Sequence, residues 1–341
     1  MTDQAWETLS NQAIAGAGLV YFLSLLSYLV QWASLRKVPA VREPSRVTVG
    51  AGEGLDKLDR RDDGGLEDDT HDEPVEARSR RADMTGRLGL ILAGLACTLH
   101  LVSLVGRGMA ADPNRVPWGN MYEFTVSGTF VVALIFLVAR RRLGLDWAGP
   151  LVVAIVLTLL MVSVIWLYDP VAPLTEALNS YWLVIHVVSA VIATGAFTLG
   201  GLCSVLYLVK DRKKNVTTGY LARVPEPAAL DKAAYRLHAF AFPVWTFAVL
   251  ITGPIWAHQA WSSYWNWDPK EVWAFITWVV YAAYLHARAT AGWRGRNAAY
   301  LALLGMATLW FNFIGINYFS TTSQHSYASG APAISSVPSL R

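Results

Sequence analysis

The chain has 341 residues, of which 54% are hydrophobic and only 16% are charged. This balance is typical of a protein with several transmembrane helices and excludes an ordinary soluble domain. The formal net charge of +3 gives no indication of a nucleic-acid partner.

Eight apolar segments are expected to form transmembrane helices, because a chain in lipid must hydrogen-bond its own backbone groups. They cover residues 13–32, 88–105, 124–139, 148–168, 181–209, 237–256, 272–286 and 298–319. The first segment lacks the basic flank of a cleavable signal peptide, so it is expected to be retained. The sequence therefore predicts an all-α polytopic membrane protein with about eight transmembrane helices.

The distribution of lysine and arginine predicts how these helices are oriented. The connections after the first, third, fifth and seventh segments hold 24 of the 28 basic residues. The other side holds only Arg107, Arg115, Lys270 and Arg341. Because basic residues concentrate on the cytoplasmic side, both termini are expected outside the cytoplasm.

Residues 36–87 differ in composition from the rest of the chain. They are rich in Asp, Glu, Arg and Gly and contain almost no aromatic residues, which is typical of a disordered segment. The chain is therefore divided into an external N-terminus with the first helix (1–35), a disordered charged cytoplasmic linker (36–87), a transmembrane core (88–327) and an external tail (328–341).

The two cysteines, Cys97 and Cys203, lie inside apolar segments. The sequence has no CxxC or CxxCH pair, so the chain is neither a thiol oxidoreductase of that type nor a c-type cytochrome. Both cysteines are expected to pack as small apolar side chains.

The stretch 256–278, WAHQAWSSYWNWDPKEVWAFITW, contains six of the fifteen tryptophans. One tryptophan beside an apolar segment favours a membrane-interface belt. Six of them, interleaved with Asp268-Pro269-Lys270-Glu271 on the external side, favour a site for a flat aromatic ligand.

A second external connection leads into the third segment with Trp118, Asn120, Tyr122 and Glu123. The run Pro-Trp-Gly-Asn is typical of a turn, and a glutamate at a helix start is stabilised by the helix dipole. This structural interpretation explains Glu123 as well as a catalytic one does.

Two histidines flank the tryptophan-rich stretch on the external side. His186 lies near the external end of the fifth segment, and His325 follows the eighth. Two neutral imidazoles facing each other across an aromatic platform can hold a haem iron axially. The alternative is that His186 is hydrogen-bonded within the bundle and His325 is a solvated loop residue. The spacing alone leaves both interpretations open.

The other intramembrane histidines also need partners. His238 and His286 lie toward the inner ends of the sixth and seventh segments. Each is either a headgroup-level residue or a ligand for a group in the inner leaflet. His100, deep in the second segment, and His258, in the external loop, are expected to be satisfied core and loop residues.

With these features in place, the sequence resembles the CcsA/ResC family, the membrane subunit of two-component (System II) cytochrome c synthases, whose tryptophan-rich signature is called WWD. The resemblance covers about residues 88–327 in the family's order. Its motifs are WGNMYEF at 118–124, WLVIHV at 182–187, WNWDPKEVWAFITW at 265–278, YLHAR at 284–288 and GINYFSTTSQHSY at 315–327. One departure is Thr322-Ser323-Gln324 before His325, where Gly-Leu is usual.

The resemblance implies which residues bind haem. His186 and His325 would ligate haem beside the WWD loop, and His286 would ligate haem inside the membrane. The other implied contacts are Trp118, Trp256, Trp261, Trp265, Trp267, Asp268, Lys270 and Glu271. Haem b would be bound as a transported substrate, and no residue would act as an acid–base catalyst. Lys270, Arg107 and Arg115 are the candidates for pairing with the propionates. Asp268 and Glu271 are expected either to orient the loop or to pair with these cations.

The resemblance also implies a function and its partners. The chain would move haem across the plasma membrane of a bacterium and present it externally for covalent attachment to the CxxCH motif of apocytochrome c, as part of a holocytochrome c synthase (haem lyase) complex. The expected partners are a ResB-type membrane protein, which supplies the second intramembrane ligand, apocytochrome c and a thiol-reducing membrane protein. The alternatives are a System I-like haem delivery or lyase protein and a di-haem quinone-reactive electron-transfer subunit.

Overall fold

The computed structural model describes residues 1–35, 75–171, 180–213, 216, 219–320 and 323, and within these ranges the regular structure is entirely helical. The long helices are α1 (Asp3–Leu35), α2 (Val75–Met109), α3 (Met121–Leu143), α4 (Gly149–Trp166), α5 (Tyr181–Arg212), α7 (Pro227–Thr246), α9 (Pro269–Thr290) and α10 (Arg296–Trp310). Shorter elements are η1 (Asp146–Ala148), α6 (Tyr220–Arg223), η3 (Phe247–Thr252), α8 (Gly253–Trp261), η4 (Phe311–Gly315) and α11 (Ile316–Phe319).

All eight predicted segments are helical, which confirms the all-α membrane fold. In the part of the chain that the structure describes, seven helical stretches are both long and apolar enough to cross a membrane. The seventh predicted segment lies in α9, a 22-residue helix that does not belong to this set, because tryptophan, tyrosine and histidine residues reduce its apolar character. The count of eight spans therefore stays a prediction.

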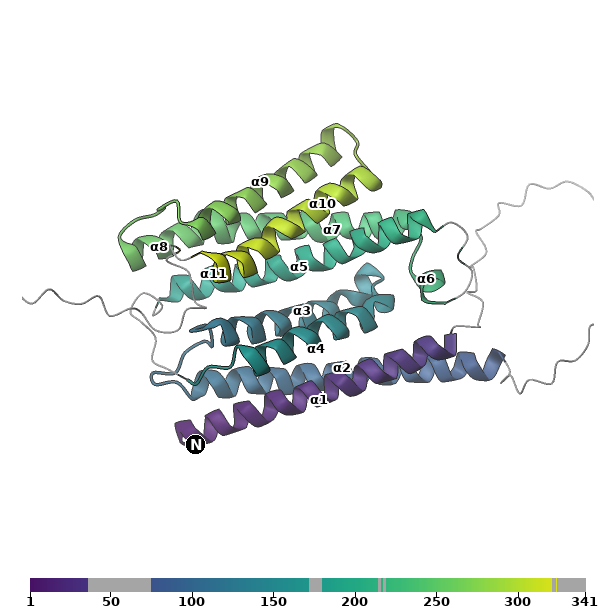
Figure 1. Ribbon diagram of the computed structural model, residues 1–341, viewed down its shortest axis with the longest axis horizontal. Coiled ribbons are helices and arrows are strands. Elements are labelled where there is room, and N and C mark those ends of the chain that lie inside the picture. The colour runs from purple at the N-terminus through teal and green to yellow at the C-terminus, as the bar shows by residue number, and fades with distance from the viewer. Residues whose placement is uncertain (36–74, 172–179, 214–215, 217–218, 321–322, 324–341) are drawn as a thin grey trace, which may run out of the picture.

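The helices run side by side along one axis (Figure 1). Helices α1–α4 form one side of the bundle, and α5 with the later helices forms the other. Large apolar side chains such as Leu19, Ile91 and Val138 are more than half exposed on its outside, as expected for a surface that faces lipid. Cys97 and Cys203 are buried among the apolar side chains of the core, as predicted.

The two ends of the bundle differ in what they carry. The N-terminus of α1 and the connection between α8 and α9, which holds the tryptophan-rich stretch, lie at the same end (Figure 1). The connection between α9 and α10 lies at the opposite end. This arrangement agrees with the predicted alternation of the spans, while the side of the membrane on which each end lies stays a prediction.

The structure corrects one predicted boundary. Residues 75–87, assigned from composition to the disordered linker, form the first turns of α2. Alanine, arginine and glutamate in this stretch favour helix, and Glu76 stands four residues before Arg80, the spacing that stabilises a helix. The remainder of the predicted linker lies outside the described residues.

Candidate functional site

The tryptophan-rich loop is held by the first turn of α9. Asp268 is the N-cap residue: its Oδ1 accepts a hydrogen bond from the Lys270 backbone N–H at 2.9 Å. Glu271 Oε2 in turn accepts from the backbone N–H groups of Asp268 at 3.1 Å and Asn266 at 2.9 Å. Such a capping box satisfies backbone donors that would otherwise be unpaired. Asp268 and Glu271 thus hold the backbone of the loop at the start of α9.

The loop backbone adopts an unusual conformation at two positions. Ser262 has φ of 58° and Trp267 has φ of 56°, and a bulky residue at positive φ is rare. Trp267 has 71% of its surface exposed, and its ring meets the Trp265 ring edge-on at 5.9 Å. Strained backbone of this kind is concentrated in functional loops.

His186 is held against a π-helical turn of the neighbouring helix. Its Nδ1 lies 2.9 Å from the carbonyl oxygen of Ala248, in η3. Because the carbonyl can only accept, Nδ1 carries the proton and the lone pair is on Nε2, the form in which imidazole binds a metal. Gly253 makes room for the ring, since a Cβ there would lie 3.2 Å from His186 Cε1.

Two tryptophans of α8 and one from the connection before α3 form an apolar cluster next to this histidine. Trp256 is 1% exposed, and its ring is stacked parallel to the His186 ring with centroids 6.0 Å apart. Trp261 meets Trp256 edge-on at 4.8 Å, and buried Trp118 packs in the same apolar cluster. Trp118 and Trp261 therefore pack in the same cluster as Trp256.

A cavity of about 340 Å³ opens beside these residues between α3, α4, α5, the stretch from the end of α7 through η3 to α8, the start of α9, and α10–η4. Its volume lies at the lower end of the range for small-molecule sites. Among the residues predicted to bind haem, His186, Trp256, Trp265, Lys270 and Glu271 line it. Along α5 the lining runs from Leu183 to Thr198, which corresponds to about 22 Å of helix.

The remaining predicted contacts lie off this cavity. Trp118, Trp261, Trp267 and Asp268 are not among its lining residues, although each adjoins one that is. His286 is exposed near the far end of α9, about 25 Å along the helix from Pro269. His325 lies outside the described residues.

Lys270 is a cation placed at the cavity wall. Its Nζ donates a hydrogen bond to Asn317 Oδ1 at 2.9 Å. Burial lowers the pKa of Lys270 to about 8, and the nearby Asp268 carboxylate opposes this shift. An anionic partner in the cavity would therefore stabilise the charged form of Lys270.

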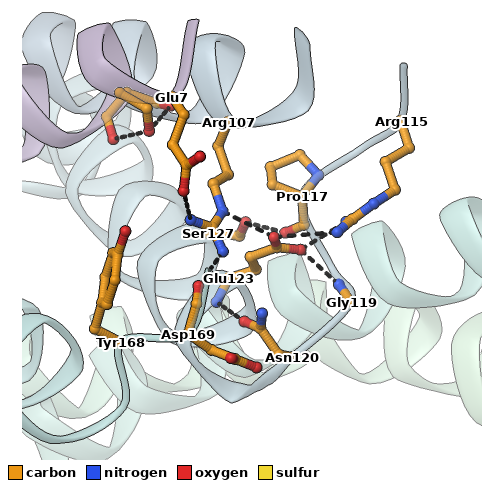
Figure 2. A network of polar contacts seen from close by, with 12 residues as sticks. Glu7, Arg107, Arg115, Pro117, Gly119, Asn120, Glu123, Ser127, Tyr168 and Asp169 are labelled. Atoms are coloured by element: carbon orange, nitrogen blue, oxygen red, sulfur yellow. Dashed lines mark hydrogen bonds and ion pairs between the residues drawn. The ribbon is translucent and has the colours of Figure 1, made fainter. Parts of the chain in front are cut away.

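The two other basic candidates for the propionates are already engaged by Glu123 (Figure 2). The Glu123 carboxylate is 1% exposed and accepts from Arg107 Nε at 2.9 Å, Arg115 Nη1 at 2.7 Å and the Gly119 backbone N–H at 2.6 Å. Asn120 caps α3 by accepting from the Glu123 backbone N–H. Glu123 thus joins two arginines and the turn before α3, and neither arginine lines the cavity.

The structure also tests the interpretation of the other histidines. His238 is fully buried against Phe197, Tyr281 and Tyr284, so the headgroup-level interpretation is wrong for it, because α9 covers that face of α7. His100 is a core residue, with Nε2 3.0 Å from the Val126 carbonyl oxygen. His258 is exposed and stacked on Tyr264 with centroids 4.2 Å apart.

Sequence reasoning missed three polar residues of this site, Asn312, Asn317 and Ser323. All three are less than 10% exposed, and the two asparagines line the cavity. An asparagine within an apolar helix near its external end is a signal that points to such a site. Ser323, in a polar stretch, carries no comparable signal.

Comparisons with known proteins agree with the resemblance seen in the sequence. Residues 118–323 match the family model of the cytochrome c assembly protein. The cytochrome c biogenesis protein CcsA of Guillardia theta is 35% identical over 68% of this chain and 83% of its own length. CcsA of Synechococcus sp. is 30% identical over 68% of this chain and 86% of its own length.

A solved structure shares the fold. The cytochrome c haem lyase CcmF superposes with a TM-score of 0.58 at 14% sequence identity, over 92% of this chain. The chain spans 46% of the length of that protein. At this level of identity the likeness concerns the arrangement of the helices alone.

Proposed function

Because the chain belongs to the cytochrome c assembly protein family, we propose that it is the membrane subunit of a cytochrome c synthase. It moves haem b across the membrane and presents it beside the tryptophan-rich loop for covalent attachment to the CxxCH motif of apocytochrome c. The family implies the general task, cytochrome c biogenesis. The site residues support the more specific assignment.

The observation that carries the proposal is the position of His186. Its ring lines the cavity, and its Nδ1–H group donates a hydrogen bond to the Ala248 carbonyl oxygen. A hydrogen bond from the second ring nitrogen fixes the tautomer and orientation of a metal-binding imidazole. His186 is thus prepared as one axial ligand, and His325 is proposed as the other.

The cavity walls suit a porphyrin in polarity. Apolar side chains and the indole rings of Trp256 and Trp265 provide surfaces for its faces. An anionic propionate in an apolar site needs a charged donor, and Lys270 at the wall supplies one. The residues present therefore fit haem as a substrate.

Attachment of haem to apocytochrome c requires from this chain mainly that it orient the haem toward the two cysteine thiols. Each thioether forms when a cysteine thiol adds across a haem vinyl group: the sulfur bonds to the inner vinyl carbon and the proton goes to the outer one. This addition consumes no oxidant or reductant, although haem must enter it in the reduced state. The contribution of the chain is to hold the vinyl edge accessible while the iron is fixed.

His286 is proposed to serve the transfer of haem through the membrane. It is exposed on α9 on the same helical face as Phe275, Val279 and Ala283, all of which are also exposed. A ResB-type partner that packs on this face would supply the second ligand. The bacterial plasma membrane and the external position of the tryptophan-rich loop belong to the same proposal.

The test is maturation of a reporter cytochrome c in cells that express this chain with its ResB-type partner. We expect covalent haem attachment and a six-coordinate low-spin haem spectrum in the purified complex. The His186→Ala, His325→Ala double variant should lose both, while His258→Ala, which alters an exposed histidine off the cavity, should retain both. Full maturation by the double variant would reject the proposal. Quinol-driven haem reduction without any effect on maturation would indicate the electron-transfer alternative.

A further inference from the structure

Asn312 is a buried asparagine in the wall of the cavity. Its side chain belongs to a residue that is only 7% exposed, and its Oδ1 has no hydrogen-bond partner among the residues that the structure describes. Burying a polar atom without a partner lowers the stability of a protein, and such atoms are rare in native structures. An unpaired amide at a cavity wall is explained if a bound ligand supplies the partner.

Asn317 provides a direct comparison in the same helical stretch. It is 3% exposed and also lines the cavity. Its Oδ1 accepts a hydrogen bond from Lys270 Nζ at 2.9 Å, and its Nδ2 donates to the Phe313 carbonyl oxygen. The amide of Asn317 is therefore satisfied by the protein at both ends, whereas that of Asn312 is not.

The π-helical turn η4 holds Asn312 beside the start of α9. The Phe311 ring, in the same turn, packs on Trp273 with centroids 4.2 Å apart, and the Lys270–Asn317 bond joins the two segments one turn further on. Figure 1 shows α11 at the end of the bundle that carries the connection between α8 and α9. Asn312 thus lines the cavity where it adjoins the tryptophan-rich loop.

Trp265 brings a second unused polar group to the cavity. Its Nε1 is buried and has no acceptor within the described ranges of the chain. The indole N–H is a donor only, while the amide of Asn312 offers a donor and an acceptor that exchange places when the amide rotates by half a turn. Both side chains can therefore donate to an anionic oxygen.

The charge of the cavity wall shows why neutral donors would be needed. Lys270 is the one lysine or arginine among the described residues that line it. Haem carries two propionates on one edge, and a carboxylate in an apolar site needs hydrogen-bond donors if it has no cation of its own. A single lysine leaves that need unmet for one of the two.

We propose that Asn312 and Trp265 supply the neutral donors of a carboxylate site beside Lys270, and that this site selects haem by its propionates. Both are then specificity-determining residues that contact the ligand away from the iron. The inference rests on the proposed function, in which the ligand of the cavity is haem.

The test compares two iron porphyrins in the full-length chain purified with its partner. Haem b carries the propionates, whereas iron etioporphyrin has the same ring and metal with alkyl groups only. In Asn312→Leu we expect haem b to bind about 10- to 100-fold more weakly, the effect of losing a hydrogen bond to a charged group. Iron etioporphyrin should bind Asn312→Leu as well as it binds wild type.

Trp265→Phe, which keeps an aromatic ring and removes the N–H group, should show the same selective loss. The low-spin spectrum of haem b at saturation should persist in both variants, because the ligands of the iron are unchanged. An equal loss for both porphyrins would mean that the substituted residue only shapes the cavity, and would overturn its assigned role.

A second measurement needs no porphyrin. Asn312→Leu removes an amide that has no partner to lose, so the unfolding temperature of the ligand-free complex should stay the same or rise. Asn317→Leu is the matched control: it removes two hydrogen bonds at a similarly buried position, so the unfolding temperature should fall. An equal fall in both variants would show that the protein itself uses the Asn312 amide, and the inference would be wrong.

Failure of this inference differs from failure of the proposed function. If wild type binds haem b no better than His186→Ala does, the proposed function fails and the carboxylate site fails with it. If binding depends on His186 but wild type does not prefer haem b to iron etioporphyrin, the proposed function stands and the carboxylate site is rejected.

Discussion

His186 Nδ1 lies 2.9 Å from the carbonyl oxygen of Ala248, in a π-helical turn that interrupts the α7–α8 helix. The backbone N–H of Gly253 reaches the same oxygen, five residues along the chain, and the Thr252 hydroxyl donates to it at 3.1 Å. π-Helical turns are rare and occur frequently at functional sites. This turn presents a carbonyl group to the histidine and leaves only the space of a glycine beside the ring.

The first prediction concerns this close fit. Gly253→Ala adds a Cβ 3.2 Å from the His186 ring and 3.1 Å from the Ala248 oxygen, so the ring must shift away from its acceptor. We expect haem affinity to fall about 10- to 100-fold, measured by haem titration of the purified complex. Gly94→Ala is the matched control, because nothing lies within 4 Å of a Cβ at that position. Equal losses in both variants would contradict the model of the site.

The second prediction uses the lowered pKa of Lys270. If its ammonium group binds a propionate, haem affinity should be greatest below pH 8, where Lys270 is charged, and should fall as the pH rises above about 8. By proton linkage the fall is at most about tenfold per pH unit. Haem titrations between pH 7 and 9.5 measure it.

Two variants control for other causes of this pH dependence. Lys270→Arg keeps its charge throughout the range, so its affinity should not decline above pH 8. Lys270→Met should bind haem weakly at every pH. A decline in Lys270→Arg equal to that of wild type would show that another group, such as a ligand to the iron, titrates instead.

The helices were predictable because each corresponds to one contiguous apolar segment of the sequence. An apolar run long enough to span lipid can be only a helix, and all eight runs are helical. The start of α2 was not predictable in this way, because residues 75–87 are polar and composition does not separate a polar helix from a disordered segment. Helix propensity and the Glu76–Arg80 spacing carry the only local signal.

The site was predictable only in part, for the same reason. The tryptophan cluster lies within one stretch, so the sequence alone indicated it. The capping box of Asp268 and Glu271 lies in the same stretch, although only the structure shows it. The bonds His186–Ala248 and Ser323–Asp268 join residues more than fifty positions apart. Nothing local marks Ser323 as a partner of Asp268, and the pairing of Arg107 with Glu123 likewise depends on how α2 packs beside α3.

The third prediction concerns His286, which is exposed on α9. Its replacement by alanine removes no buried contact, so stability should change by less than about 0.5 kcal/mol. Haem loading of the complex should nevertheless fall, and added imidazole should restore it if the vacated position is accessible. Haem content per complex, measured by the pyridine haemochrome spectrum with and without imidazole, provides the test. Unchanged loading would remove His286 from the proposed path.

The last prediction separates a structural network from the haem site. Glu123→Ala leaves Arg107 and Arg115 buried without their shared carboxylate (Figure 2), and breaking a buried ion pair in this way costs about 3–5 kcal/mol. Asp146→Ala removes the partner of Arg140 at an exposed position, with 60% of the Asp146 side chain accessible, so the loss should be below about 1 kcal/mol. Unfolding of both variants in detergent measures the difference.

Because neither arginine lines the cavity, the folded fraction of Glu123→Ala should still bind haem with the low-spin spectrum of wild type. A stable Glu123→Ala protein with altered haem coordination would instead assign these arginines to the haem.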